Sequence, residues 1–123
     1  MQQAVSITRA LSDPSRMRVV AALMQHDELC VCQVTELLGL STPTVSRHMS
    51  ILHGARLVES RKDGRWVYYR LSGTFPPLLR QWLTESLANS AQVEADRVAV
   101  DGVLQCDAGE LCRGQRARVR VNR

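Results

Sequence analysis

Apolar residues recur at helical spacing through the first half of the chain, and helix-start signals separate the recurring stretches. Residues 12–14 (Ser-Asp-Pro) combine a capping side chain with a proline suited to the first helical position. Residues 41–43 (Ser-Thr-Pro) repeat this signal, and Gly39 offers a C-cap to the segment before them. The pattern therefore predicts helices over residues 3–11, 14–24, 32–38 and 42–55.

The helix predicted over residues 42–55 has two distinct faces. Val45, Met49 and Leu52 are spaced by four and three residues, so they should turn inward together. The other face carries short or polar groups of the kind that suit a groove. Two helices joined by a short Gly-containing turn form a helix-turn-helix unit, which we assign to residues 32–38 and 42–55.

A β-hairpin should follow this unit. The β-rich runs 57–61 and 65–71 flank residues 62–64 (Lys-Asp-Gly), and Asp-Gly between such runs is a hairpin signal. A basic-tipped hairpin directly after such a helix is a wing. The sequence therefore predicts an α+β fold, mostly α with a β-hairpin wing, that is, a winged helix-turn-helix.

Residues 75–77 (Phe-Pro-Pro) open a last predicted helix, and beyond about Val98 the periodicity fails. We expect one domain over residues 1–96 and a flexible, Cys-containing basic tail over 97–123. The last helix has an apolar face that is too extensive for a terminal helix without a packing partner. This face should therefore lie in a homodimer interface. Its members are Leu78, Leu79, Trp82, Leu83 and Leu87.

The composition indicates the cellular compartment and the kind of binding partner. Residues 41–72 hold six basic and two acidic residues, and residues 113–123 hold five arginines and no acid, which suits a phosphate partner. No apolar run is long enough to span a membrane, and the N-terminus lacks a secretory pattern. We therefore expect a cytoplasmic protein, whose four cysteines are metal-binding or reactive groups before they are disulfides.

The strongest chemical signal is the pair Cys30 and Cys32 at the start of the helix predicted over 32–38. Free backbone N–H groups at a helix N-terminus favour thiolate, and soft ions prefer thiolates to imidazole or carboxylate. On a regular helix, residues i and i+2 point about 200° apart, so ion binding should unwind the first turn. The alternative is that both cysteines pack as small hydrophobic residues.

Short hydroxyls and basic groups define the expected DNA surface. Those on the second helix of the helix-turn-helix should reach base edges and phosphates, and those on the wing should meet phosphate or the minor groove. The helix residues are Ser41, Thr42, Thr44, Ser46, Arg47 and His48, and the wing residues are Arg61, Lys62 and Arg65.

Three stretches together resemble the ArsR/SmtB family of metal-responsive repressors: residues 28–32 (Glu-Leu-Cys-Val-Cys), 41–49 with Leu52, and 61–71. The similarity covers roughly residues 5–90, and the first stretch is similar to the family's arsenic-sensing members. The resemblance implies a homodimeric, non-enzymatic repressor of arsenical resistance. It would bind double-stranded operator DNA without ion and leave it when As(III), Sb(III) or methylarsenite binds Cys30 and Cys32. The first and last helices would supply the dimer contact.

One position departs from the family pattern, since Thr35 stands where a third cysteine often occurs. Arsenite normally takes three sulfurs, and we favour two protein sulfurs with a non-protein third ligand. Cys106 and Cys112 stay open as accessory ligands, a redox pair or thiols without function.

Three other functions compete with an arsenite sensor. One is a DNA-binding redox switch that responds to thiol oxidation, and another is a sensor of a different soft ion such as Cd(II) or Pb(II). The third is a small thiol reductase, which is least favoured because the chain lacks a βαβ pattern and a Gly-rich phosphate loop.

Overall fold

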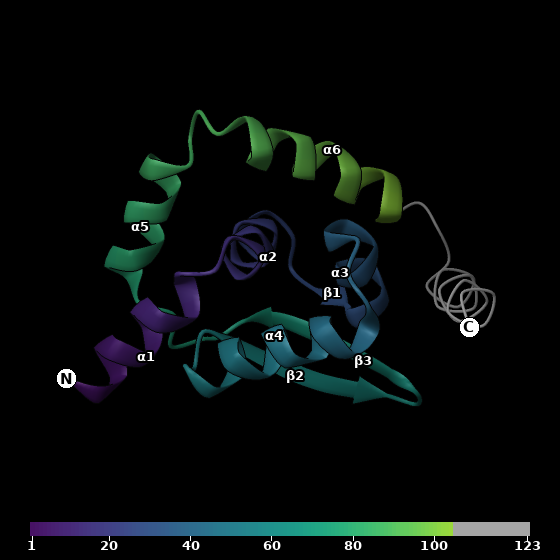
Figure 1. The fold of residues 1–123 in the computed structure, drawn as a ribbon, viewed down its shortest axis with the longest axis horizontal. Coiled ribbons are helices and arrows are strands. Elements are labelled where there is room, and N and C mark those ends of the chain that lie inside the picture. The colour runs from purple at the N-terminus through teal and green to yellow at the C-terminus, as the bar shows by residue number, and fades with distance from the viewer. Residues whose placement is uncertain (105–123) are drawn as a thin grey trace.

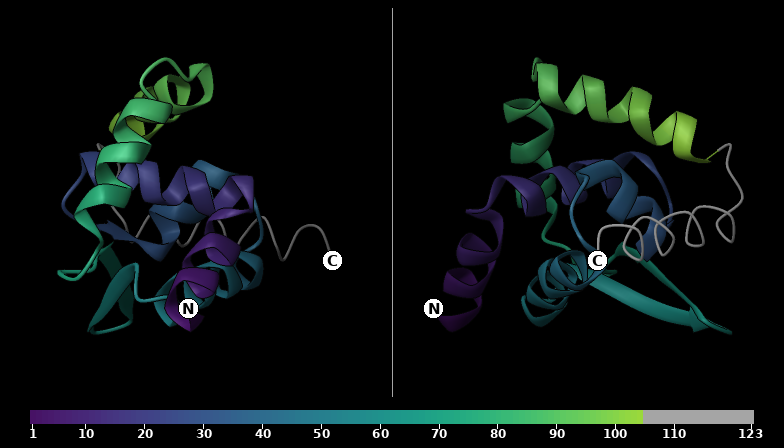
Figure 2. Two further views of the ribbon diagram at one scale, coloured as in Figure 1. Left: turned by 90° about the vertical axis from the view of Figure 1, so that its left-hand side faces the viewer. Right: turned by 45° about the vertical axis from the view of Figure 1, so that its right-hand side comes forward.

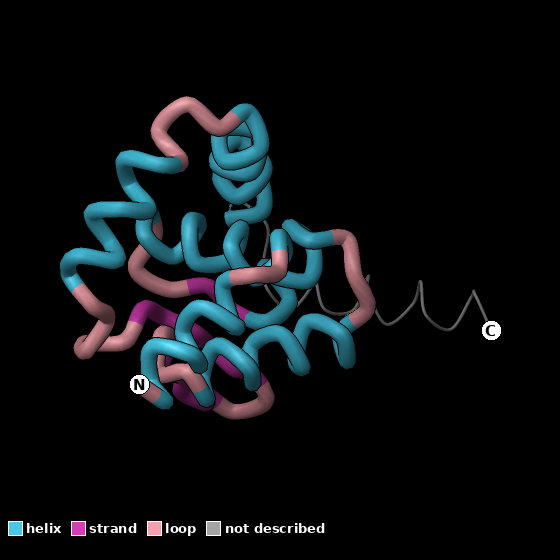
Figure 3. Tube along the Cα trace, turned by 60° about the vertical axis from the view of Figure 1, so that its left-hand side comes forward, coloured by secondary structure: helices cyan, strands magenta, loops and turns pink. Residues whose placement is uncertain are grey.

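The computed structural model describes residues 1–104, which form helices and one small antiparallel sheet (Figure 1). Helices make up most of this part of the chain, as Figure 3 shows. In chain order the elements are α1 Gln2–Leu11, α2 Pro14–Gln25, β1 Leu29–Cys30, α3 Val31–Leu38, α4 Thr42–Gly54, β2 Val58–Asp63, β3 Trp66–Leu71, α5 Pro77–Ser86 and α6 Ala91–Leu104.

Both helix-start signals in the sequence are confirmed. The Asp13 carboxylate caps α2 by accepting hydrogen bonds from the backbone N–H groups of Ser15 at 2.8 Å and Arg16 at 3.3 Å. Burial opposes ionisation of Asp13, but these two hydrogen bonds outweigh it and lower the pKa of the carboxyl. Ser41 caps α4, and Gly39 ends α3 with a φ of 66°, a left-handed conformation that glycine adopts without strain.

The core forms between the helix-turn-helix and its neighbours. Val45, Met49 and Leu52 of α4 are fully buried, as their spacing predicted. They belong to one cluster with side chains of α2, α3 and the sheet. This packing fixes α4 relative to α3, so the outer face of α4 keeps one orientation.

The predicted hairpin is confirmed, with β2 and β3 antiparallel, but its turn lies later than expected. Lys62 and Asp63 belong to β2, and the two-residue turn is Gly64-Arg65, with Gly64 at a φ of 61°. We call residues 58–71 the wing, and it extends away from the helices in Figure 2. The strand β1 was not predicted. It pairs with β3, so the strand order is β1-β3-β2.

The helix α6 is the main departure from the sequence-based expectation. It crosses α2 and reaches α3 (Figures 1 and 2), and Asp96 and Val100 on it are buried. The flexible tail expected from residue 97 is therefore not what residues 97–104 form. Cys106 and Cys112 lie outside the described residues.

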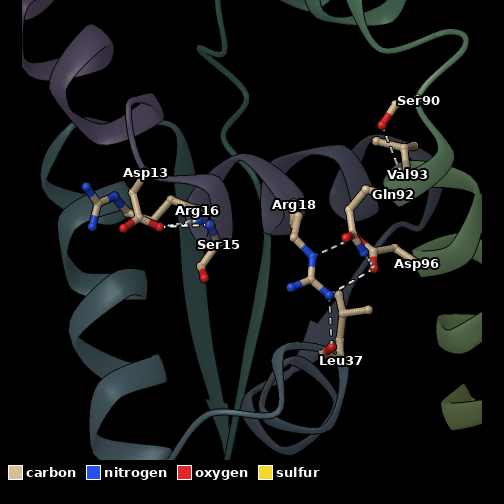
Figure 4. A network of polar contacts seen from close by, with 9 residues as sticks. All are labelled: Asp13, Ser15, Arg16, Arg18, Leu37, Ser90, Gln92, Val93 and Asp96. Carbon is tan, nitrogen blue, oxygen red and sulfur yellow. Dashed lines mark hydrogen bonds and ion pairs between the residues drawn. The ribbon is translucent and has the colours of Figure 1, made fainter.

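Polar contacts hold α6 in place (Figure 4). Arg18 of α2 donates two hydrogen bonds of 2.9 Å to the Asp96 carboxylate and one of 3.2 Å to the Leu37 carbonyl at the end of α3. Gln92 donates a further hydrogen bond of 2.9 Å to Asp96. The hydrogen bonds to Asp96 raise the pKa of Arg18, against a smaller effect of burial. One arginine thus joins α6, α2 and α3.

None of the helices in residues 1–104 combines the length and the apolar composition that crossing a bilayer requires.

Replacing Asp96 by alanine should loosen α6, because it leaves the half-buried Arg18 guanidinium without its carboxylate. We expect the free energy of unfolding, measured by urea denaturation, to fall by about 1–3 kcal/mol. Glu94→Ala on the same helix is the control: Glu94 pairs with Arg97 at 2.6 Å on the exposed face, so its loss should matter far less. Equal losses in the two variants would contradict a special role for Arg18–Asp96.

Candidate functional site

Cys30 lies where β1 ends and α3 begins. It is the N-cap of α3, with extended backbone angles of φ −81° and ψ 160°, and its side chain is fully buried. Its backbone N–H donates a 2.8 Å hydrogen bond to the Gln33 side-chain carbonyl, which completes a capping box. Cys30 therefore stands at the N-terminus of α3, where the sequence places the cysteine pair.

Cys32 lies on the first turn of α3 and is also buried. Both cysteines belong to one small cluster, in which Val31, Trp66 and Tyr68 pack against them. We call these five residues the cysteine cluster. Because Cys30 precedes the helix in an extended conformation, the angle of about 200° between side chains i and i+2 of a regular helix does not describe this pair.

Among the described residues, this cluster holds two cysteine sulfurs and no larger ligand set. No group of three or more His, Cys, Asp or Glu side chains placed to hold a metal ion occurs in residues 1–104. Thr35, three residues after Cys32, donates its hydroxyl to the Val31 carbonyl at 2.7 Å, so its hydroxyl is bonded within α3. Two sulfurs can supply two of the ligands of a soft ion.

The outer face of α4 carries most of the expected DNA contacts. Ser41, Thr42, Thr44, Ser46 and Arg47 are all exposed. Ser41 and Thr44 also bond to each other through their hydroxyls at 2.8 Å, so both serve the helix cap as well.

His48 differs from these neighbours because it is half-buried. Its Nδ1 lies 3.0 Å from the guanidinium of Arg16, which can only donate, so Nδ1 accepts. Arg16 also donates to the Ala10 carbonyl at 2.7 Å. His48 thus ties α4 to the junction of α1 and α2, a structural contact that the sequence did not predict.

The three basic wing residues are not equivalent. Lys62 and Arg65 are exposed at the hairpin tip. Arg61 instead donates from Nε and Nη2 to the two carboxylate oxygens of Glu28 at 2.7 and 2.6 Å, and its guanidinium lies 4.4 Å from the centre of the Tyr68 ring. The hydrogen bond from Arg61 lowers the pKa of Glu28, and the same bond raises the pKa of Arg61.

The sequence did not predict Trp66 and Tyr68 as neighbours of the two cysteines, or Glu28 as the partner of Arg61. Glu28 and Arg61 are 33 residues apart, so no local pattern pairs them. The alternation of side chains along β3 could have predicted one part of this cluster, since Trp66 and Tyr68 lie on the same face of that strand. Which face meets the cysteines depends on β1, a two-residue strand without a sequence pattern of its own.

The apolar stripe of the last predicted helix is divided by the fold. Leu83 is buried in the core, and Leu79 and Leu87 pack partly against it. Leu78 and Trp82 point outward, with exposed fractions of 80% and 56%. The nearby helix α1, at the same end of the molecule (Figure 1), exposes Val5 as well.

Comparisons with known proteins agree with this arrangement. The model of "Bacterial regulatory protein, arsR family" matches residues 13–60. The arsenic resistance transcriptional regulator ArsR1 of Pseudomonas putida is 33% identical over 104 residues, which cover 85% of this chain and 78% of that protein. The arsenical resistance operon repressor of Escherichia coli is 33% identical over 94 residues, which cover 76% of this chain and 77% of that protein.

Among solved structures, HlyU from Vibrio cholerae N16961 superposes with a TM-score of 0.64 at 27% identity. The match covers 72% of this chain and 95% of HlyU.

Proposed function

Because this chain belongs to the arsR family of bacterial regulatory proteins, we propose that it is a dimeric repressor that leaves its operator when a soft metalloid binds Cys30 and Cys32. The inducer is As(III) or a related species such as Sb(III) or methylarsenite. The observation that carries the proposal is that both cysteines lie in one buried cluster, at the start of α3 and against the wing.

Placement of the thiols between the two DNA-contacting elements supports an allosteric role. The helix α3 packs against α4, and β1 pairs with β3 of the wing. A rearrangement at Cys30 therefore reaches α4 through its contact with α3 and the wing through β1. A coupling of about 1–3 kcal/mol between inducer and DNA is typical of such pairs.

Relatives' names support the choice of ion. The two curated relatives described above are named for arsenic or arsenical resistance. Trivalent arsenic is thiophilic, and two neighbouring sulfurs offer two of its bonds. We assign the third position to a non-protein ligand, because Thr35 has a hydroxyl in place of a thiol.

Substituting the cysteines tests the inducer site. Cys30→Ser and Cys32→Ser should each bind operator DNA like the parent chain, because the DNA-binding form needs no ion. Each should lose release by arsenite, measured by fluorescence anisotropy of labelled operator under anaerobic, reducing conditions.

Cys106→Ser/Cys112→Ser is the matched control, and it should keep most of the response. Full release from the Cys30→Ser/Cys32→Ser double variant would place the sensor elsewhere. A reduced parent chain that stays on DNA with arsenite but leaves on oxidation would favour a redox switch.

Arg47 and Arg65 should contribute differently to DNA binding. Arg47→Ala, on the exposed face of α4, should weaken operator binding most and reduce discrimination against other sequences. Arg65→Ala, at the wing tip, should weaken all sequences alike and flatten the dependence of log K on log salt by about one unit. Arg97→Ala on α6 is the charge-matched control, and parental behaviour of all three variants in salt-dependent titrations would refute this DNA interface.

The exposed side chains of α5 and α1 should form the dimer interface. Leu78→Glu/Trp82→Glu places charges on that surface, so we expect a monomer in sedimentation velocity at micromolar concentration and weak operator binding. Val98→Glu is the control, since Val98 on α6 is also exposed, at 59%, but lies outside the proposed interface. A parent chain that is already monomeric, or a dimer that survives the double substitution, would contradict this assignment.

A further inference from the structure

A row of three side chains crosses the sheet from the cysteine cluster to the outer strand of the wing. Cys30 on β1 pairs with Tyr68 on β3, and Tyr68 pairs in turn with Arg61 on β2. Directly opposed residues of an antiparallel sheet carry their side chains on the same face. The three side chains therefore lie next to one another across all three strands.

Glu28 closes this row into a ring of contacts. Its carboxylate holds both Nε and Nη2 of Arg61, and it lies only two residues before Cys30. The Arg61 guanidinium also lies over the Tyr68 ring. Any displacement of Cys30 thus acts on Arg61 twice, through Glu28 along the chain and through Tyr68 across the sheet.

These contacts distinguish Arg61 from the other basic residues of the wing. A bidentate pair with a carboxylate uses the edge of the guanidinium that a phosphate would take. Lys62 and Arg65 have no such partner among the contacts of residues 1–104 and are exposed at the tip. Arg61 is therefore placed to hold the wing to β1, whereas the tip residues are placed to meet DNA.

We propose that Glu28 is a positioning residue that couples the cysteine pair to the wing through Arg61 and Tyr68. In the ion-free chain, the ring of contacts keeps the wing in its DNA-binding position. When Cys30 rearranges to ligate an inducer, Glu28 and Tyr68 shift relative to each other and the wing loses that position. The proposal rests on the proposed function, since it needs an inducer at the cysteines.

The Glu28–Arg61 pair can be removed without threatening the fold. The two side chains are 28% and 54% exposed, and exposed ion pairs contribute little to global stability. Neither residue belongs to the hydrophobic core. Glu28→Gln keeps the size of the side chain and removes its charge, so it tests coupling in a folded protein.

The measurement is the ratio of operator Kd with and without arsenite, on the full chain under anaerobic, reducing conditions. For Glu28→Gln we expect this ratio to fall by about five-fold or more from the parent value. Arsenite should still bind with the parental stoichiometry and affinity in the absence of DNA. A loss of coupling with intact binding separates a positioning role from damage to the site.

Glu59→Gln is the matched control. It makes the same change of charge in another exposed carboxylate–arginine pair of the wing, since Glu59 accepts from Arg70 at 3.0 Å, and it also binds Ser72 and Gly73. Its ratio should equal that of the parent. Any general effect of charge on DNA affinity will be common to both variants and cancels in the comparison.

A double-mutant cycle tests whether Glu28 acts through Arg61. The ratios for Arg61→Gln and for Glu28→Gln/Arg61→Gln should match that of Glu28→Gln alone, because each removes the same link. An independent readout is the Arg61 Nε–H resonance, assigned by its loss in Arg61→Lys. In the parent chain, the chemical shift of this resonance should change when arsenite binds. In Glu28→Gln, the resonance should already be displaced and should change little when arsenite is added.

The outcomes separate the two proposals. If Glu28→Gln keeps the parental ratio of operator Kd with and without arsenite, the proposed coupling through Glu28 is wrong. If Glu28→Gln also binds DNA more tightly than Glu59→Gln does, Arg61 is a direct phosphate contact that Glu28 restrains. If arsenite, antimonite and Cd(II) all fail to release the parent chain, the proposed function is wrong and the link falls with it.

Discussion

The pairing of Cys30 with Tyr68 is the contact on which the rest of the site depends. It places an extended residue directly before a helix, so one cysteine ends a strand and the other lies on the first turn of α3. It also sets the face of β3 that carries Trp66 and Tyr68 against the two cysteines. A two-residue strand thereby connects α3 to the wing.

This connection explains how a small change can reach a DNA-binding surface. Buried side chains are closely packed, so a cluster that rearranges moves its neighbours. In this chain those neighbours are α4, through its packing on α3, and the wing, through β1 and β3. The first turn of α3 is held by local contacts, the capping box of Cys30 with Gln33 and the Thr35 hydroxyl on Val31.

The opposite end of α3 is fixed by a different interaction. Arg18 joins the Leu37 carbonyl to Asp96, so α6 braces the C-terminal end of α3 while its N-terminal end holds the thiols. The same ion pair holds α6 against α2 and α3.

The sequence by itself determined the elements whose signals are local. Capping residues, prolines and glycines marked the helix starts and ends, the spacing of Val45, Met49 and Leu52 set the buried face of α4, and Asp-Gly set the hairpin. It also pointed to Cys30 and Cys32, because paired thiols at a helix start are a chemical pattern.

Only the tertiary structure decided the relations between distant segments. The strand β1 is too short to have a periodicity, and the amphipathic pattern of α6 is weak because few of its residues are buried, notably Asp96 and Val100. Glu28 meets Arg61, and Arg18 meets Asp96, across 33 and 78 residues of chain. Such pairs depend on how the chain folds back on itself, which no local spacing encodes.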